Sequence, residues 1–315
     1  MTSAIAIRKL TKRFGTLAAV DELDLEVRTG EVFGFLGPNG AGKSTTIRCV
    51  LDLSHPTSGT VTVLGLDSHR DSLAIRRRVG YCPGDLALWA NLTGQQVIDY
   101  LANLRGGVDP ARVAELAERM NADLTRRCRD YSSGNRQKVG LIQAFMHDPE
   151  LVILDEPSAG LDPLMQQELQ QLISEVRSDG RTVLLSSHTL SEVERVADRV
   201  GIIRHGRLVE VSTVTDLKAN AVRGLELEFA ADVDPARLRD VEGVREVTGA
   251  GHQLTVTYDG AIEPVLEAAI ALGVVNLHSQ DADLEQIFLA YYRDDEAPAD
   301  GRPAAGAARP PAGAR

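Results

Sequence analysis

The chain has 315 residues, 43% of them hydrophobic, which is enough for one large domain and one small domain with buried cores. Its net charge is -11, and residues 224–300 hold 17 acidic and four basic side chains, whereas residues 1–223 hold 28 acidic and 27 basic. This balance argues against a general nucleic-acid-binding surface, which needs clustered Lys and Arg.

No window approaches the roughly eighteen consecutive apolar residues of a membrane-spanning helix. Residues 1–9 begin a strand-like alternation and lack the apolar core of a signal peptide. We therefore expect a chain that stays in the cytosol and spans no membrane. Cys49, Cys82 and Cys128 are odd in number and share no ligand spacing, so we expect reduced thiols without a disulfide or zinc site.

Residues 1–220 alternate strands with helices, which predicts a layered α/β domain. The apolar run 31–36 is a strand that leads through a glycine-rich loop into a helix over 43–53. A turn then precedes the alternating strand 60–64.

The glycine-rich loop has the phosphate-binding pattern G-x-x-x-x-G-K-[ST], in the strand-loop-helix context that this pattern requires. Its glycines let backbone N–H groups surround a phosphate at a helix N-terminus, where the helix dipole favours negative charge. Lys43 is expected to reach the β and γ phosphates, Ser44 to ligate Mg2+ and Thr45 to contact the α phosphate. The predicted nucleotide-binding residues of this loop are Gly37, Pro38, Asn39, Gly40, Ala41, Gly42, Lys43, Ser44 and Thr45.

Residues 93–148 are predicted to form a mostly helical insertion. Residues 93–96 fit a capping box before a helix that runs to Leu104, and Asp109-Pro110 supplies an N-cap and a first-turn proline. The same insertion contains a second Ser/Gly turn, 131–135, which opens another helix. A second anion-binding turn far from the first suggests that two copies of the chain close around each nucleotide.

The apolar runs 151–154 and 182–185 predict central parallel strands that are covered on both faces. Polar residues follow each run, at the edge where open α/β sheets bind ligands. Asp155 is suited to hold Mg2+ through a water, and Glu156 to orient or deprotonate the attacking water. His188 stands where a side chain touches the γ phosphate or positions that water. We therefore predict Glu156 and His188 as catalytic residues.

The rest of the first segment predicts a closing hairpin, 200–204 with 208–211. Residues 221–292 predict a compact acidic unit of βαββαβ-like order that ends in a helix over 283–292. Residues 293–315 are rich in Pro, Gly, Ala and Arg and are expected to be disordered, because they have few apolar side chains to bury.

The order and spacing of these motifs resemble the ATP-binding-cassette (ABC) ATPase family over about residues 4–216. Residues 37–45 look like its Walker A motif, 131–135 like its signature turn, 151–156 like Walker B with the catalytic Glu, 158–162 like the D-loop, and His188 like the switch histidine. The resemblance implies a P-loop NTPase fold: a RecA-like core with an N-terminal antiparallel β subdomain and an inserted helical subdomain, followed here by a small α+β C-terminal domain.

The resemblance also implies further nucleotide contacts. Phe14 matches the aromatic residue that stacks on adenine, although a core role on an edge strand is the alternative for it. Ser132 and Gly134 of one subunit would bind the γ phosphate held by Lys43 of the other, in an ATP-dependent, head-to-tail homodimer or in a pair with a similar subunit. The implied contacts from this side of the site are Ser132, Ser133, Gly134, Asn135 and Asp162.

One departure from the family pattern concerns the metal and the permease. Members commonly place Gln after the strand that resembles 79–83, where its side chain reaches Mg2+ and the loop contacts the membrane partner; here Gly84 fills the position and Asp85 follows. Three readings stay open: Asp85 substitutes as a metal ligand, the metal keeps an extra water, or turnover is slow. Ser133 for the usual Gly and Asn135 for the usual Gln are milder departures.

The acidic segment, with its motif 283–289, resembles the ATP-binding subunits of type-2 bacterial exporters, including the daunorubicin-resistance type; a generic oligomerisation or regulatory domain is the alternative. We expect an ATPase subunit, peripheral on the inner face of the cell membrane, that drives separate integral membrane permease chains and exports a drug-like or other hydrophobic compound. A cassette protein that acts on ribosomes or nucleic acid, and a nucleotide-gated subunit with slow turnover, remain alternatives.

Overall fold

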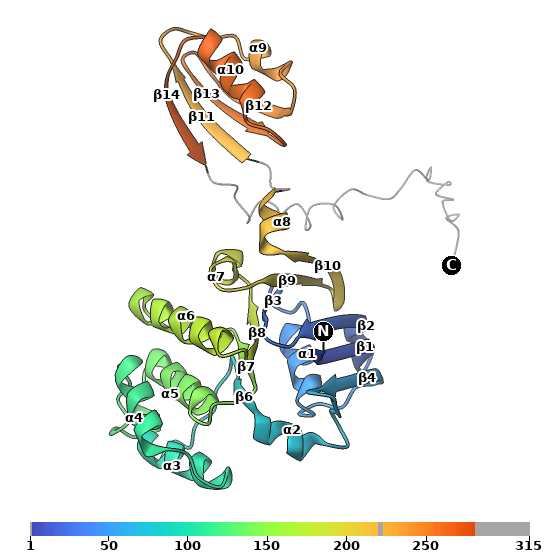
Figure 1. Ribbon diagram of the computed structural model, residues 1–315, viewed down its shortest axis with the longest axis vertical. Coiled ribbons are helices and arrows are strands. Elements are labelled where there is room, and N and C mark those ends of the chain that lie inside the picture. The colour runs from blue at the N-terminus through green and yellow to red at the C-terminus, as the bar shows by residue number, and fades with distance from the viewer. Residues whose placement is uncertain (1, 220–222, 281–315) are drawn as a thin grey trace, which may run out of the picture. The chain divides into compact units, whose positions relative to one another are not determined.

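The computed structural model describes residues 2–219 and 223–280, and the chain divides into two compact units, Met1–Asn220 and a second that begins at Ala221 (Figure 1). The helix expected at 283–292 and the tail expected at 293–315 lie outside the described residues. In the ranges that are described, no helix combines the length and the apolar composition needed to cross a membrane.

The first unit contains a small antiparallel sheet of order β2-β1-β4-β5. Its strands are β1 (Ser3–Phe14), β2 (Leu17–Arg28), β4 (Ser58–Val63) and β5 (Leu66–Asp67). Alternate side chains of β1 and β2, such as Ile5, Ile7 and Leu25, turn into the core that also receives Phe33 and Phe35 from the larger sheet. The predicted N-terminal antiparallel β subdomain is confirmed.

The larger sheet has the order β10-β9-β3-β8-β7-β6. Its strands are β3 (Val32–Leu36), β6 (Val79–Cys82), β7 (Leu151–Asp155), β8 (Thr182–Ser187), β9 (Arg199–Arg204) and β10 (Arg207–Thr213). Every pair is parallel except β9–β10, which is an antiparallel hairpin. The strands β3, β7 and β8 are buried along their whole length, which explains their continuous apolar sequences.

Helix α1 (Lys43–Val50) is shorter than the helix predicted over 43–53. Asp52 has a left-handed φ of 54°, and its N–H donates to the carbonyl of Cys49, while the N–H of Leu53 donates to the carbonyl of Arg48 at 2.8 Å. These bonds form a Schellman motif, which ends the helix before the apolar pattern ends.

The inserted lobe is helical, as expected. Its helices are α3 (Gly94–Leu104), α4 (Pro110–Arg119), a short 3-10 turn (Cys128–Asp130) and α5 (Ser133–Phe145), and Figure 1 shows α3, α4 and α5 together at the β6–β7 end of the sheet. The hydroxyl of Thr93 accepts from the N–H of Gln96 at 3.2 Å, and the Gln96 side chain accepts from the N–H of Thr93 at 2.9 Å. The predicted capping box is confirmed.

The remaining helices of the first unit are α2 (Ser72–Arg78), α6 (Pro163–Ser178), α7 (Leu190–Glu194) and α8 (Val214–Ala219). A guanidinium connects the inserted lobe to α6, because Arg119 at the end of α4 pairs with Glu168 at 2.6 Å and with Glu175 at 2.7 Å.

The second unit is an α+β fold around one antiparallel sheet of order β12-β13-β11-β14. Its elements are β11 (Arg223–Phe229), α9 (Ala236–Arg239), β12 (Val244–Ala250), β13 (Gln253–Tyr258), α10 (Glu263–Ala271) and β14 (Val274–Gln280). Leu225 and Tyr258 of the sheet pack with Leu238 and Val265 of the helices. The predicted βαββαβ order is confirmed for the described part of this unit.

Candidate nucleotide site

The loop between β3 and α1 has little room for side chains. A Cβ on Gly37 would approach the carbonyl of Ile203 at 2.5 Å, and one on Gly42 would approach the carbonyl of Ala19 at 2.5 Å. Gly40 and Gly42 also have φ values of 81° and 111°, which glycine adopts without strain. The first N–H groups of α1 follow Gly42, so this loop presents unpaired backbone donors to an anion.

Lys43 places a buried ammonium group at this loop. Only 5% of the side chain is exposed, and Nζ donates to the carbonyls of Gly37 at 2.5 Å and Pro38 at 3.2 Å. Nζ also lies 3.0 Å from Oε1 of Glu156. A buried ammonium needs an anionic partner, and a cation beside a glycine cradle at a helix N-terminus fits a polyphosphate. Ser44 and Thr45 occupy the first turn of α1 and are half-buried.

Asp155 and Glu156 stand at the carboxyl end of β7, as predicted. Asp155 is buried, and its Oδ1 accepts a hydrogen bond of 2.6 Å from the hydroxyl of Ser186. The N–H of Glu156 donates to both the carbonyl and the hydroxyl oxygen of Ser186. Glu156 has a φ of 51°, a strained conformation that these two bonds hold in place. Carboxylate and hydroxyl oxygens such as those of Asp155 and Ser44 are the donors that Mg2+ prefers.

Ser186 was missed by the sequence reasoning. It belongs to β8 and pairs in register with Asp155 of β7. The available signal was a serine inside a buried apolar strand that lies next to the strand carrying the carboxylates. Such a buried hydroxyl needs a partner, and Asp155 supplies it.

His188 follows β8 and completes a chain of three side chains. Its Nδ1 lies 2.7 Å from Oε2 of Glu156, so each Glu156 oxygen has its own partner, Lys43 on one side and His188 on the other. The imidazole is 55% exposed, whereas the ammonium is buried. Residues far apart in sequence therefore meet at one carboxylate that can orient a water beside a bound phosphate.

The turn 131–135 opens α5 and packs against the loop that follows Glu156. The Ser132 hydroxyl accepts from the N–H of Asn135 at 3.2 Å and caps the helix, while the Asn135 amide bonds both backbone groups of Asp123 at 2.9 Å. A Cβ on Gly134 would lie 2.7 Å from the carbonyl of Gly160, so this contact requires glycine.

An open cavity of about 540 Å³ brings the predicted signature and D-loop residues together. Its lining includes Ser132, Ser133, Gly134, Asn135 and Asp162. Asp162 also caps α6, because its Oδ1 accepts from the N–H of Met165 at 3.0 Å. The sequence reasoning missed Gln137, whose side-chain amide donates to the carbonyl of Pro157 at 3.0 Å and connects α5 to the segment after Glu156.

The two remaining predicted residues lie at the margins. Phe14 ends β1 and is 54% exposed, with Nζ of Lys12 at 4.9 Å from its ring centroid. Gly84 lies against the carboxylate pair, because a Cβ there would approach the carbonyl of Asp155 at 3.1 Å and Cβ of Glu156 at 3.6 Å. Asp85 follows it and is exposed. The close contact at Gly84 favours a small residue there.

Residues 20–159 match the family model described as ABC transporter. The linearmycin resistance ATP-binding protein of Bacillus subtilis (strain 168) is 31% identical over 304 residues, which cover 89% of this chain and 95% of that protein. The chain belongs to the ABC transporter family. A daunorubicin resistance ATP-binding protein of Streptomyces coeruleorubidus is 38% identical over 222 residues, which cover 69% of this ABC chain and 70% of that protein.

A solved structure of the ATP-binding subunit of an ABC transporter has a TM-score of 0.63 and 29% identity, and the match covers 69% of this chain and 92% of that one. The predicted P-loop NTPase fold is confirmed. As an ABC ATPase subunit, this protein binds and hydrolyses ATP.

Proposed function

We propose that this ABC subunit powers an exporter of drug-like or other hydrophobic compounds by acting on separate integral membrane permease chains at the inner face of the cell membrane. The observation that carries the proposal is the meeting of Lys43, Glu156 and His188 within a unit that also presents the turn 131–135. The names of the drug-resistance relatives support the export part, because one of them matches almost the whole chain.

In this proposal, Lys43 and the N–H groups at the start of α1 bind the β and γ phosphates. Glu156 orients the attacking water, and His188 holds the carboxylate from the other side. Ser44 and Asp155 would hold Mg2+, which when bound neutralises charge on the β and γ phosphates. The hydroxyl of Ser186 fixes the orientation of Asp155 for this role.

The second half of the site would come from another subunit. The turn at Ser132 and Ser133 is exposed, opens a helix N-terminus and lines an open cavity, so an anion held by another chain can reach it. In a head-to-tail dimer, this turn would close over the γ phosphate bound at Lys43 of the partner chain. ATP would then hold the dimer together, and hydrolysis would release it.

An exposed aromatic pair supports docking to a permease. Trp89 is 51% exposed and lies edge-to-face with Tyr100, with ring centroids 5.3 Å apart. Trp89 follows the loop of Gly84 and Asp85, which the family resemblance assigns to contact with the membrane partner. Exposed Trp and Tyr are enriched at the centres of protein interfaces.

Glu156→Gln tests the ATPase and dimer parts of the proposal. We expect ATP binding to persist and hydrolysis to be abolished, because the amide keeps the volume of the side chain but cannot act as a base. The variant should therefore accumulate as a dimer with ATP and Mg2+ in size-exclusion chromatography. A monomeric variant with wild-type hydrolysis would overturn the assigned roles.

Affinity purification of the tagged protein from membranes tests the permease part. We expect a polytopic membrane protein to co-purify, and less of it with the double variant Trp89→Ser/Tyr100→Ser. Leu164→Ser, at an exposed apolar residue of α6, is the control. Recovery without any membrane partner under native expression would contradict this part of the proposal.

A further inference from the structure

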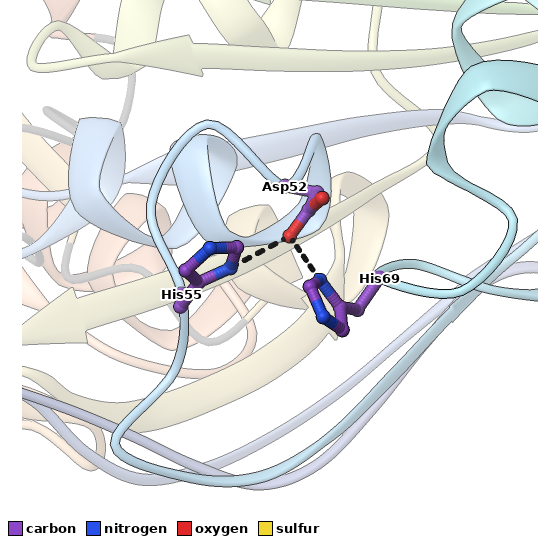
Figure 2. Close-up of side chains that lie close together, drawn as sticks. All are labelled: Asp52, His55 and His69. Atoms are coloured by element: carbon purple, nitrogen blue, oxygen red, sulfur yellow. Dashed lines mark hydrogen bonds and ion pairs between the residues drawn. The ribbon is translucent and has the colours of Figure 1, made fainter.

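Three side chains meet on the first unit in a cluster that the nucleotide site does not use. Oδ1 of Asp52 accepts hydrogen bonds from Nδ1 of His55 at 2.9 Å and from Nδ1 of His69 at 3.0 Å. Figure 2 shows both imidazole rings turned toward the same carboxylate. The three ligand-capable atoms lie within 4.8 Å of one another. Among the described residues, no other group of three His, Cys, Asp or Glu side chains is gathered in this way.

The three residues come from separate segments, and each backbone is held in place. Asp52 closes the Schellman motif at the end of α1, and His55 precedes β4 with its carbonyl accepting from Nζ of Lys12 at 2.8 Å. His69 follows β5, and its N–H donates to Oδ1 of Asp67 at 3.0 Å. The fold therefore positions the cluster before any ligand arrives.

Asp52 is an unfavourable choice for its local position. The left-handed residue after a helix C-terminus is usually Gly, and the helix dipole disfavours a negative charge there. Burial raises the pKa of this carboxyl, but the hydrogen bonds and charges of His69 and His55 lower it further, so the net pKa lies below its ordinary value. A residue that breaks local rules and stays ionised points to a use for its side chain.

We propose that Asp52, His55 and His69 form a binding site for a divalent transition-metal ion of the Zn2+ class. Two imidazole nitrogens and one carboxylate oxygen are a common ligand set for such ions, with water completing four-coordination. Ligand atoms of a tetrahedral zinc site lie roughly 3.4 Å apart when the bonds are near 2.1 Å. The Nδ1–Oδ1 separations of 2.9 and 3.0 Å are close to this spacing, so small side-chain movements admit the ion.

The surroundings leave room for the ion and its water. The imidazoles of His55 and His69 are 69% and 67% exposed, whereas the carboxylate of Asp52 is nearly buried. The guanidinium of Arg76 approaches the other carboxylate oxygen, Oδ2, at 3.8 Å and donates to the carbonyls of Leu51 and Asp52. Oδ1 therefore remains for the metal, while the nearby positive charge limits the affinity.

A bound ion would connect the end of α1 to the segments before β4 and after β5. Because α1 begins at Lys43, the metal would clamp the far end of the helix that carries the phosphate loop. An ion that binds only the folded chain raises the free energy of unfolding. Zinc is therefore expected to raise the thermal midpoint as well as to bind.

Isothermal titration of the full, nucleotide-free chain with ZnCl2 tests the proposal. We expect one zinc at this cluster and a loss of affinity of roughly tenfold or more in Asp52→Asn, His55→Gln and His69→Gln. Asn is also accepted in the left-handed position after a helix, so Asp52→Asn tests ligation without disturbing the turn. Zinc should raise the thermal midpoint of the wild type but not that of Asp52→Asn.

Two variants control for other sites. His252→Gln removes an exposed turn histidine of the second unit, and His188→Gln removes an imidazole beside Glu156, and neither should change the zinc affinity at the cluster. The proposal is overturned if the wild type binds no zinc, or if the three cluster variants bind it as tightly as the wild type. The cluster would then act only as a hydrogen-bonded clamp.

Discussion

The two anion-binding turns of the first unit differ in how much of their chemistry one chain supplies. At the phosphate loop, the buried Lys43 already contacts Glu156, which in turn contacts His188. At the signature turn, Ser132 and Ser133 are exposed and line an open cavity. One chain thus completes the first half internally and presents the second half outward. The contrast explains why two chains would be needed to enclose one nucleotide.

Removing the buried ammonium should have the largest effect, because it disables the half that one chain completes. We expect Lys43→Ala to lose ATP affinity and to lower hydrolysis by roughly a hundredfold or more. Fluorescent-nucleotide binding and phosphate release measure the two effects. Lys9→Ala, at an exposed residue of β1, is the control and should match the wild type.

A negative charge in the signature turn should separate the two halves. We expect Ser133→Glu to bind ATP at the phosphate loop but to lose ATP-dependent dimerisation and most hydrolysis, because the carboxylate repels the γ phosphate of the partner chain. Ser133→Gly restores the residue that the family usually has and should stay active. If Ser133→Glu dimerises normally with ATP, the outward-facing half has no role in enclosing the nucleotide.

Mixing the two defective proteins sharpens the comparison further. A head-to-tail pair of Lys43→Ala and Ser133→Glu contains one site with both defects and one site with neither. We expect partial recovery of ATP-dependent dimerisation, measured by light scattering, above that of either variant alone. No recovery at any mixing ratio would contradict the head-to-tail arrangement.

Asp85 tests what replaces the usual glutamine beside the internally completed half. We expect Asp85→Asn to lower kcat several-fold with little change in ATP affinity, because a charged oxygen near the metal acts mainly in the transition state. Asp85→Glu is the matched control and should retain more activity. An unchanged kcat would leave the readings with an extra metal-bound water or with slow turnover.

The smallest expected effect concerns the connection between the lobe that carries the signature turn and α6. Arg119→Met removes the pairs with Glu168 and Glu175, and these groups are partly exposed, so we expect a loss of about 1 kcal/mol in the free energy of unfolding. Urea denaturation measures it, with the exposed Arg77→Met as control. A loss equal to that of the control would show that the pairs contribute nothing.

The same connection has a predictable pH dependence. The hydrogen bond from Arg119 outweighs burial and holds the pKa of Glu175 below its ordinary value. The pair therefore stabilises the fold above the ordinary Glu pKa, and this contribution is lost as the pH falls through the lowered one. The difference between the wild type and Arg119→Met should shrink in acid.

Local patterns were sufficient for much of this protein. The capping box at Thr93, the N-cap at Asp109 and the glycines of the phosphate loop depend on neighbours within a few residues, so the sequence shows them directly. The buried strands β7 and β8 were also predictable, because coverage on both faces requires continuous apolar runs. The end of α1 was not, since the left-handed turn at Asp52 interrupts a pattern that still reads as helical.

The sequence by itself determined the ABC ATPase fold and the identity of the phosphate-binding and carboxylate residues. Only the tertiary structure decided which side chains meet: Glu156 with both Lys43 and His188, and Asp155 with Ser186. The physical reason is that parallel register aligns the carboxyl ends of strands that are distant in sequence. Local periodicity carries no information about that alignment, nor about the meeting of His55 and His69 at Asp52.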